Sequence, residues 1–379
     1  MLRLGTNGTI VPPVEGIIRG AQRGDEGPFD ALWWPDHLMG WHPQSIWDLS
    51  PLSAFMPNPH IFVDTVAALA AAAVHTERVL LGSAVTEPVR RHPAMLAQQF
   101  LTLDHFSKGR VIFGFGAGER ENIQPYGLDL SRPVSRFEEA ITIIRSLWEN
   151  DEPIDFDGDF WKLEDAVVGM GPFGSAPDGS RRYPPIWSGA HGPRMLDIVG
   201  RLCDGWLPAY LGGLDAWMSG WEAVQSSAQA ADRDSAEITG AIYANVVVDE
   251  DPLEVDRICD HPIIKAWQLV TPSWAFEKLG YRHPLGEDWN GFRDYVPARY
   301  GRDDALKAID DVPLEVSRTY LLSGTPDEIV KELQELEEGG LSHAVLWNVT
   351  YMADLAKLSG SYHLVAEIAR ELKGQPSTE

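Results

Sequence analysis

Short apolar runs of strand type alternate with longer helical patterns along most of the 379 residues, in about eight pairs. This alternation is typical of a parallel sheet, because parallel neighbours are joined by helical crossovers. Eight units favour an α/β fold, a closed (β/α)8 TIM-type barrel with insertions, over the alternative of an open doubly wound sheet. The expected strands are residues 2–7, 31–34, 79–85, 111–115, 186–189, 205–210, 242–248 and 344–348.

Helices are expected between these strands, at residues 61–74, 93–106, 137–148, 193–202, 214–231 and 325–338. The clearest pattern has apolar residues at helical spacing and charged residues on its other faces. Its apolar residues are Phe137, Ile141, Ile144 and Trp148. Another helix start is indicated by Thr325 as N-cap, Pro326 in the first turn and Glu328 as the acid three residues on. Such one-sided helices are expected to cover a sheet.

Two stretches interrupt the alternation. Residues about 151–165 favour a β-hairpin insertion, because Asp157-Gly158 stands between two short alternating runs. Residues about 251–315 mix helical patches with turn sequences, which favours a capping insertion, and the sequence leaves open whether it acts as a lid. No Pro/Ser-rich linker divides the chain, so residues 1–379 are expected to form a single barrel domain.

The charge balance limits the class of partner. Lys and Arg number 31 against 56 Asp and Glu, a formal net charge of -25. Such a chain repels nucleic acid and anionic membranes, so we expect a small-molecule substrate instead. The longest apolar run, residues 66–74, is about half of the roughly 18 residues that span a membrane. The absence of a signal-like N-terminus favours the cytoplasm, where Cys203 and Cys259 are expected as buried thiols, with a disulfide left open.

Residues suited to chemistry follow several of the strands. After residues 31–34 come Asp36, His37 and Trp41, and a histidine at a barrel mouth suits proton transfer near neutral pH. The alternative is that His37 only hydrogen-bonds a turn. After residues 111–115 a Gly-x-Gly-x-Gly run ends at Glu119, a candidate proton donor or acceptor. The run lacks the helix that a dinucleotide-binding fingerprint requires, and it can also be a structural turn.

A third segment favours phosphate binding. His191 and Gly192 precede Pro193, which is well placed as a first helical residue, so the amides that follow and the Arg194 side chain suit a phosphate. An ordinary helix start is the alternative. The eleven histidines include no H-E-x-x-H pattern, and we expect no metal site. A G-x-S-x-G elbow is also absent, which argues against an α/β-hydrolase.

Four segments in order resemble the luciferase-like superfamily: WWPDHLMGW, LGSAVTEP, GFGAGERENIQPYG and PPIWSGAHGPRML. Within it they are most similar to the oxidoreductases that use coenzyme F420, a 5-deazaflavin, such as F420-dependent glucose-6-phosphate dehydrogenase and phthiodiolone ketoreductase. The likeness extends from residue 2 to about residue 346. It implies hydride transfer between the deazaflavin and an alcohol or ketone, in a homodimer. An FMN-dependent luciferase-like monooxygenase is the first alternative, and a two-lobed solute-binding protein is a weaker one.

The resemblance also implies roles for individual residues. His37 matches the family's proton-handling histidine, Trp41 the aromatic beside the transferred hydride, and Glu119 the carboxylic acid near a deazaflavin ring nitrogen. A non-prolyl cis peptide is implied at Ala84-Val85. The cofactor contacts that it implies are Asp36, Ala84, Val85, Thr86, Glu87, Ala117, Gly118, Asn122, His191, Gly192, Arg194 and Met195.

One departure from the family bears on the substrate. Sugar-phosphate dehydrogenases of this branch carry a threonine and a lysine for the substrate phosphate just after the position of Asp204-Gly205. This chain has WLPAYLGG at residues 206–213, without a cation. We therefore expect an uncharged or lipid-like substrate, in a pocket whose candidate wall residues are Trp41, Trp47, Phe55 and Met56.

Overall fold

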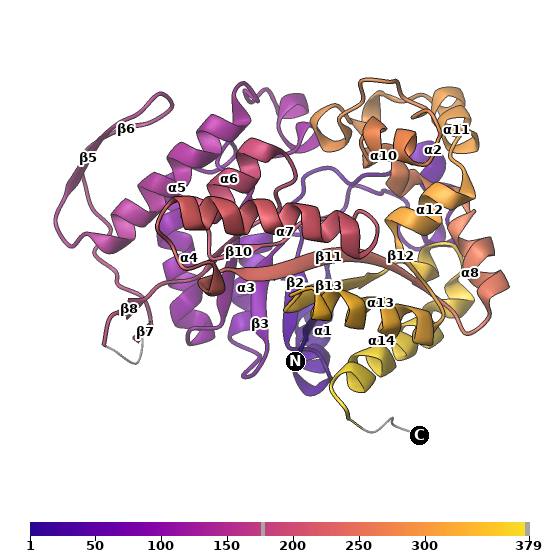
Figure 1. Cartoon of the computed structure of the whole chain (residues 1–379), viewed down its shortest axis with the longest axis horizontal. Helices are drawn as coiled ribbons and strands as arrows, with labels where there is room; N and C mark the ends of the chain where they lie inside the picture. Colours follow the sequence, from indigo (N-terminus) through magenta and orange to yellow (C-terminus); the bar gives the residue numbers. More distant parts are fainter. Residues whose placement is uncertain (176–178, 376–379) are drawn as a thin grey trace.

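The computed structural model describes residues 1–175 and 179–375. At its centre is a ring of parallel strands surrounded by helices (Figure 1). Within the described residues the ring has eight members: β1 (Arg3–Asn7), β2 (Ala31–Trp34), β3 (Leu80–Ser83), β4 (Val111–Gly114), β9 (Ile186–Ser188), β10 (Gly205–Trp206), β11 (Thr239–Val248) and β13 (His343–Asn348).

The ring closes because every member pairs with two neighbours. β1 pairs with β2 and β13, and β10 pairs with β9 and β11, all in parallel. The predicted (β/α)8 barrel is therefore confirmed, and the alternative of an open sheet is wrong. β10 is shorter than the expected strand 205–210, since Pro208 has no N–H for the ladder and pairing returns only as a bridge between Ala209 and Tyr243.

The barrel interior is filled by aromatic rings. Trp33 and Trp187 lie with their centroids 5.4 Å apart, and Trp33 Nε1 donates to Nε2 of the buried His343 at 3.3 Å. Glycines on neighbouring strands make room for the indoles: a Cβ at Gly82 would lie 2.2 Å from the Trp33 ring, and one at Gly205 would lie 2.6 Å from the Trp187 ring. The centre is thus a packed core.

Helices pack around the ring with their apolar faces inward. The predicted stripe on α5 is buried, and Thr325 and Glu328 form the predicted capping box at the start of α13. The sequence interpretation did not include α1 or α14, which cover the barrel beside β1 and β13. The outer helices are α1 (Val14–Glu26), α3 (Thr65–Ala73), α4 (Pro93–Ser107), α5 (Pro133–Glu149), α6 (Pro193–Leu202), α7 (Gly213–Ala230), α13 (Pro326–Glu338) and α14 (Leu358–Leu372).

The first interruption is a hairpin of β5 (Ile154–Asp157) and β6 (Lys162–Ala166), which projects from the body of the molecule (Figure 1). Its loop comprises residues 158–161, longer than a two-residue Asp-Gly turn. The Glu139 carboxylate on α5 accepts hydrogen bonds from three amides of this loop. A second small pair, β7 (Gly174–Ser175) with β8 (Arg181–Arg182), was not expected.

The second interruption lies between β11 and the short strand β12 (Leu322–Gly324), which pairs with β11 outside the ring. Its regular elements among the described residues are all helices. They pack against α2 (Gln44–Trp47) and the long loop after β2, in a second hydrophobic cluster that also includes Val247 of β11 and Trp347 of β13. The helices are α8 (Pro252–Cys259), α9 (Pro262–Lys265), η5 (Ala266–Val270), α10 (Ser273–Lys278), η6 (Gly291–Arg293), η7 (Pro297–Arg299), α11 (Arg302–Asp310) and α12 (Leu314–Tyr320).

Two further expectations concern the whole chain. Cys203 and Cys259 are both buried and free, so the disulfide that the sequence left open is absent. Among the described residues, none of the helices is both long enough and apolar enough to cross a membrane.

Candidate active site

The loop after β2 places His37 at the C-terminal rim of the barrel. Its side chain is only 5% exposed. The imidazole packs against Trp41, with centroids 4.2 Å apart, and against Phe62 at 5.4 Å. Trp41 packs in turn on Trp267 of the capping region, and its carbonyl accepts a hydrogen bond from the buried Tyr295 hydroxyl. The capping region therefore forms part of the wall behind His37.

Asn122, at the end of η2 (Arg120–Asn122), orients the His37 ring. Its Oδ1 accepts hydrogen bonds from the backbone N–H of Leu38 at 2.8 Å and of Met39 at 3.1 Å, so its amide nitrogen faces His37 Nδ1 at 2.8 Å. The Met39 carbonyl oxygen lies 3.2 Å from the same Nδ1. Because Nδ1 has a donor and an acceptor beside it, each neutral tautomer of the ring has a partner.

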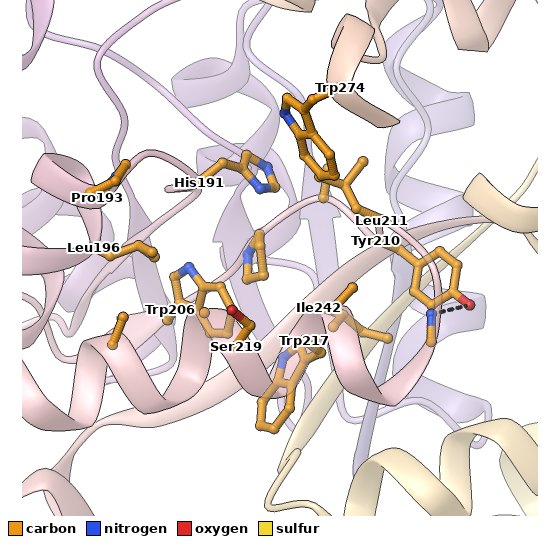
Figure 2. Close-up of a pocket in the computed structure, with 16 residues that line it drawn as sticks. His191, Pro193, Leu196, Trp206, Tyr210, Leu211, Trp217, Ser219, Ile242 and Trp274 are labelled. Atoms are coloured by element: carbon orange, nitrogen blue, oxygen red, sulfur yellow. Dashed lines mark hydrogen bonds between the residues drawn. The ribbon is translucent and has the colours of Figure 1, made fainter. Parts of the chain in front are cut away.

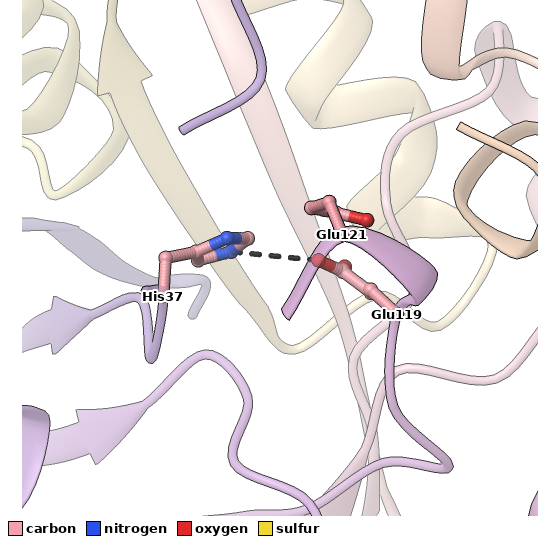
Figure 3. Close-up of side chains that lie close together, drawn as sticks. All are labelled: His37, Glu119 and Glu121. Carbon is pink, nitrogen blue, oxygen red and sulfur yellow. Dashed lines mark ion pairs between the residues drawn. The ribbon is translucent and has the colours of Figure 1, made fainter. Parts of the chain in front are cut away.

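Glu119 faces the other nitrogen of His37. Glu119 Oε2 lies 3.6 Å from His37 Nε2, and the Glu119 side chain is 31% exposed (Figure 3). Burial lowers the pKa of His37, and the nearby Glu119 carboxylate only partly offsets this effect. His37 is consequently neutral at pH 7, the state in which a histidine can accept a proton.

Glu121 is a third member of this group that the sequence interpretation missed. It lies in η2 and is 0% exposed, and neither of its carboxyl oxygens has a hydrogen-bond partner among the described residues. One atom each of His37, Glu119 and Glu121 lie within 4.8 Å of one another (Figure 3). Burial raises the pKa of Glu121 well above its usual range, and the Glu119 carboxylate adds to this effect. An acid two residues after Glu119 was the only signal in the sequence.

Asp36 and Glu87, expected at the cofactor, belong to a buried ion network beside His37. Arg90 Nη2 lies 3.1 Å from Asp36 Oδ2, and Arg90 Nε donates to Glu87 Oε1 at 2.6 Å. Arg91 also pairs with Asp36 and donates to Thr86 Oγ1 at 3.2 Å. Burial alone would raise the pKa of Asp36, but the two guanidinium groups more than offset it and lower that pKa. The carboxylates of Asp36 and Glu87 thus already form ion pairs within the protein, and their contacts with a cofactor stay a prediction.

The glycine run at the end of β4 allows the backbone to pack closely against the neighbouring segment. A Cβ at Gly114 would lie 1.7 Å from the Ser83 carbonyl oxygen, and one at Gly116 would lie 2.8 Å from the Val85 side chain. The Ala84-Val85 peptide bond is cis, as the resemblance implies. Gly118 has a φ of +94°, which few other residues adopt, and this turn leads into Glu119. Gly114 and Gly116 thus have a structural role, which was the alternative to ligand binding. Contacts of Ala117 and Gly118 with a ligand stay a prediction.

Residues 191–195 lie at the start of α6, which follows β9. Gly192 is the N-cap and Pro193 is in the first turn, as the sequence predicts, while Met195 is buried in the core. Arg194 is exposed and pairs with Glu138 at 3.1 Å. β2, β3, β4 and β9 are neighbours in the ring, so all the predicted site residues follow four adjacent strands at one rim.

A cavity of about 420 Å³ opens at the same rim, between β10, α7 and α10 (Figure 2). Its wall is apolar and aromatic, with Trp206, Tyr210, Trp217 and Trp274 as the largest side chains, and Lys and Arg are absent from the described residues that line it. His191 borders it. Residues 206–213, singled out for lacking a cation, supply a large part of the wall.

The four wall residues expected on the loop after β2 lie elsewhere. Trp41 and Trp47 are buried in the cluster under the capping region, and Trp47 Nε1 donates to the Met56 carbonyl. Phe55 is 80% exposed. None of them lines the cavity of Figure 2, because the capping region, which the sequence did not place, covers this loop. Their contact with a substrate elsewhere at the rim stays a prediction.

Comparison with known proteins agrees with this fold. The model of the luciferase-like monooxygenase family matches residues 3–343. A phthiodiolone/phenolphthiodiolone dimycocerosates ketoreductase of Mycobacterium sp. (strain JLS) is 34% identical over 350 residues, which cover 91% of this chain and 90% of that protein.

Two solved structures share the fold at 21% identity. An F420-dependent secondary alcohol dehydrogenase in complex with an F420-acetone adduct has a TM-score of 0.70, over 94% of this chain and 97% of that one. A coenzyme F420-dependent tetrahydromethanopterin reductase from Methanopyrus kandleri has a TM-score of 0.71, over 97% of both chains. With its family match over most of the sequence and a relative 34% identical over nearly its whole length, the chain belongs to the luciferase-like monooxygenase family.

Proposed function

We propose that the protein is a coenzyme F420-dependent oxidoreductase of the alcohol dehydrogenase or ketoreductase type. The observation that carries the proposal is the buried His37, neutral, oriented by Asn122 and facing Glu119 at the barrel rim. That arrangement suits the transfer of one proton to or from an oxygen atom. The ketoreductase relative and the two F420-dependent structural neighbours support the choice of reaction and cofactor.

The residues of the site fit a planar, hydrogen-bonding ligand with an anionic tail. Buried Trp41 Nε1 and Ser188 Oγ lack partners among the described residues, and both belong to segments of this rim. A Cβ at Gly192 would meet no atom within 4 Å. The first amides of α6 have no partner inside the helix and suit a phosphate. The bound deazaflavin would supply the acceptor or donor of the hydride.

His37 handles the proton that accompanies the hydride. When the carbinol carbon loses a hydride, the electrons of its O–H bond form the carbonyl and the hydroxyl proton passes to His37 Nε2. The Met39 carbonyl accepts from Nδ1–H in this state, and the Glu119 carboxylate stabilises the imidazolium. In the reducing direction, the same nitrogen protonates the developing alkoxide. Trp41 would pack beside the reacting carbon.

The substrate that fits best is uncharged or lipid-like. The cavity of Figure 2 offers aromatic and aliphatic walls, and its bordering His191 is adjacent to the proposed phosphate site at Gly192. An apolar chain gains about 25 cal/mol for each Å² that it buries there, whereas a phosphate would lose its hydration without a cation in return. A homodimer in the cytoplasm completes the proposal, and light scattering of the purified protein tests the dimer.

Binding of the two candidate cofactors tests the proposal. We expect purified protein titrated with F420 and with FMN to bind F420 the more tightly, and the loaded enzyme to reduce F420 with secondary alcohols or to oxidise reduced F420 with ketones. An FMN-dependent monooxygenase is the second candidate, which the family match favours. Tight binding of FMN with none of F420 would replace the first candidate by the second.

A further inference from the structure

Glu121 is a buried acid that the proposed proton transfer does not use. The 3-10 helix η2 carries it beside Glu119 and Asn122, and its carboxyl group is fully shielded from solvent without a hydrogen-bond donor from the described residues. An ionised carboxylate in such a place has lost its hydration without compensation, which is strongly unfavourable. A carboxyl group of this kind needs either a proton or a cation.

The charged and titratable groups around Glu121 come from several elements. Glu119 and His37 lie closest, within the cluster of Figure 3. Arg90 is the cation that acts on it, but this guanidinium is already paired with Asp36 and Glu87. Burial and the charge of Glu121 raise the pKa of Tyr295 of the capping region and of Tyr126 of η3 (Gln124–Tyr126), so both are neutral at pH 7. No unpaired cation therefore faces Glu121 within the described residues.

We propose that Glu121 is a positioning residue that shares one proton with Glu119, so that the two carboxyl groups together carry a single negative charge beside His37. Two carboxylates at such short range do not ionise together at neutral pH, and one proton stays with the pair. The single negative charge of the pair stabilises the imidazolium form of His37. A second negative charge would favour a permanently protonated His37. The proposal deepens the proposed function, on which it rests for the role of His37.

The test uses the full chain without cofactor, so its outcome does not depend on F420 binding. The infrared difference spectrum between wild type and Glu121→Gln at pH 7 should contain one protonated carboxyl band, because glutamine keeps the size and removes the acid. Asp104→Asn is the matched control: Asp104 is buried on α4, outside this cluster. The control protein should keep the band that Glu121→Gln loses. Absence of a protonated carboxyl band from the Glu121 difference spectrum would overturn the proposal.

The titration of His37, followed by NMR of labelled histidine, supplies a readout that a merely structural role would not move. Near neutral pH Glu121→Gln should leave this titration unchanged, because the pair in wild type and Glu119 alone in the variant each carry one negative charge. In wild type the second ionisation of the pair should shift the His37 resonances at alkaline pH, and the variant should lose that shift. A lowered His37 pKa in the variant would mean that Glu121 is normally charged, and would refute a shared proton.

Two further measurements make the result independent of how well the variant folds. Wild-type protein with carboxyl-labelled glutamate should show one glutamate that remains protonated at pH 7, and a spectrum without such a resonance would contradict the proposal. Addition of Zn²⁺ or Mg²⁺ should leave the His37 resonances in place. A saturable shift of those resonances by either ion in wild type, absent from Glu121→Gln, would instead make the cluster a cation site.

Discussion

The aspartate variant of Asn122 separates two tasks that one amide performs. In Asn122→Asp, one carboxylate oxygen keeps the hydrogen bonds from the Leu38 and Met39 amides, while the other replaces the amide donor beside His37 Nδ1. That oxygen can only accept from Nδ1–H, so it stabilises the imidazolium. The variant should therefore fold normally and keep His37 protonated to higher pH than wild type does.

The size of the effect follows from the 2.8 Å contact between Asn122 Nδ2 and His37 Nδ1. A hydrogen bond to a charged group contributes about 1.5–3 kcal/mol. This corresponds to about a ten- to hundredfold change in the protonation equilibrium, or about one to two pH units. The pH at which alcohol oxidation reaches half of its plateau should rise by that amount. Ketone reduction, which needs the protonated ring, should be retained.

The assay follows the absorbance of oxidised F420 across pH in both directions, together with the NMR titration of His37. Asn348→Asp is a matched control, because Asn348 is also buried and accepts from a backbone amide, but it lies on β13 with Ser361 as its other partner. The control should leave both pH profiles in place. A wild-type His37 titration in Asn122→Asp would refute the assignment of Asn122 as the residue that sets the state of the ring.

Four other variants or conditions test the rest of the site. His37→Ala should keep F420 binding and lower turnover by about a hundredfold or more, as loss of an acid–base group does; unchanged turnover would remove His37 from the mechanism. Glu119→Gln should also slow turnover, and a wild-type rate would leave Glu119 as a turn residue. Ala209→Phe should narrow the cavity and raise KM for long-chain alcohols while that for a short alcohol stays constant, and equal effects on both would place the substrate elsewhere. Burial lowers the pKa of His283 to about 4 and of His343 to about 3. Below pH 6.5 these histidines therefore bind protons in the unfolded chain but not in the native chain. Urea unfolding should therefore show stability that is full above pH 6.5 and falls by about 1.4 kcal/mol per pH unit for each such histidine below it, and a flat profile would contradict their burial as neutral rings.

Local patterns predicted most of the barrel. The strand 31–34 and the helices at 93–106 and 193–202 agree with β2, α4 and α6 to within a residue at each end, because Pro35, Pro93 and Pro193 mark their boundaries in the sequence itself. The closure of the ring has no local signal of its own. It depends on the pairing of β10 with β11, two short contacts that no local pattern indicates.

The capping region shows where local patterns fail. Its helices are short and its hydrophobic cluster is built jointly with Trp41 and Trp47, about two hundred residues away in the sequence. Neither segment has a strong periodicity of its own, so each could be recognised only with the other in place. For this reason the burial of Trp41 and Trp47 under the capping region was not predicted.

The site itself was predictable in residue type and location but not in its internal partners. His37 and Glu119 follow strands that are neighbours of β3 in the ring, so a barrel alone brings them to one rim. Asn122 was expected at the cofactor, and that contact stays a prediction; its hydrogen bond to the imidazole of His37 was not predicted. This contact arises because the chain after Glu119 forms a 3-10 helix rather than an open loop.

That helix explains why so much of the chemistry comes from four consecutive residues. In a 3-10 helix, residues three apart lie above one another, so Glu119 at the N-cap and Asn122 at the end of η2 face the same side, with Asn122 Nδ2 3.4 Å from Glu119 Oε2. The side that they share faces both nitrogens of His37. Glu121 takes another position round η2, which is in contact with η6 of the capping region, and its side chain is fully buried. An extended chain at this point would place Glu119 and Asn122 about 10 Å apart, and the imidazole would lose either its orienting amide or its carboxylate.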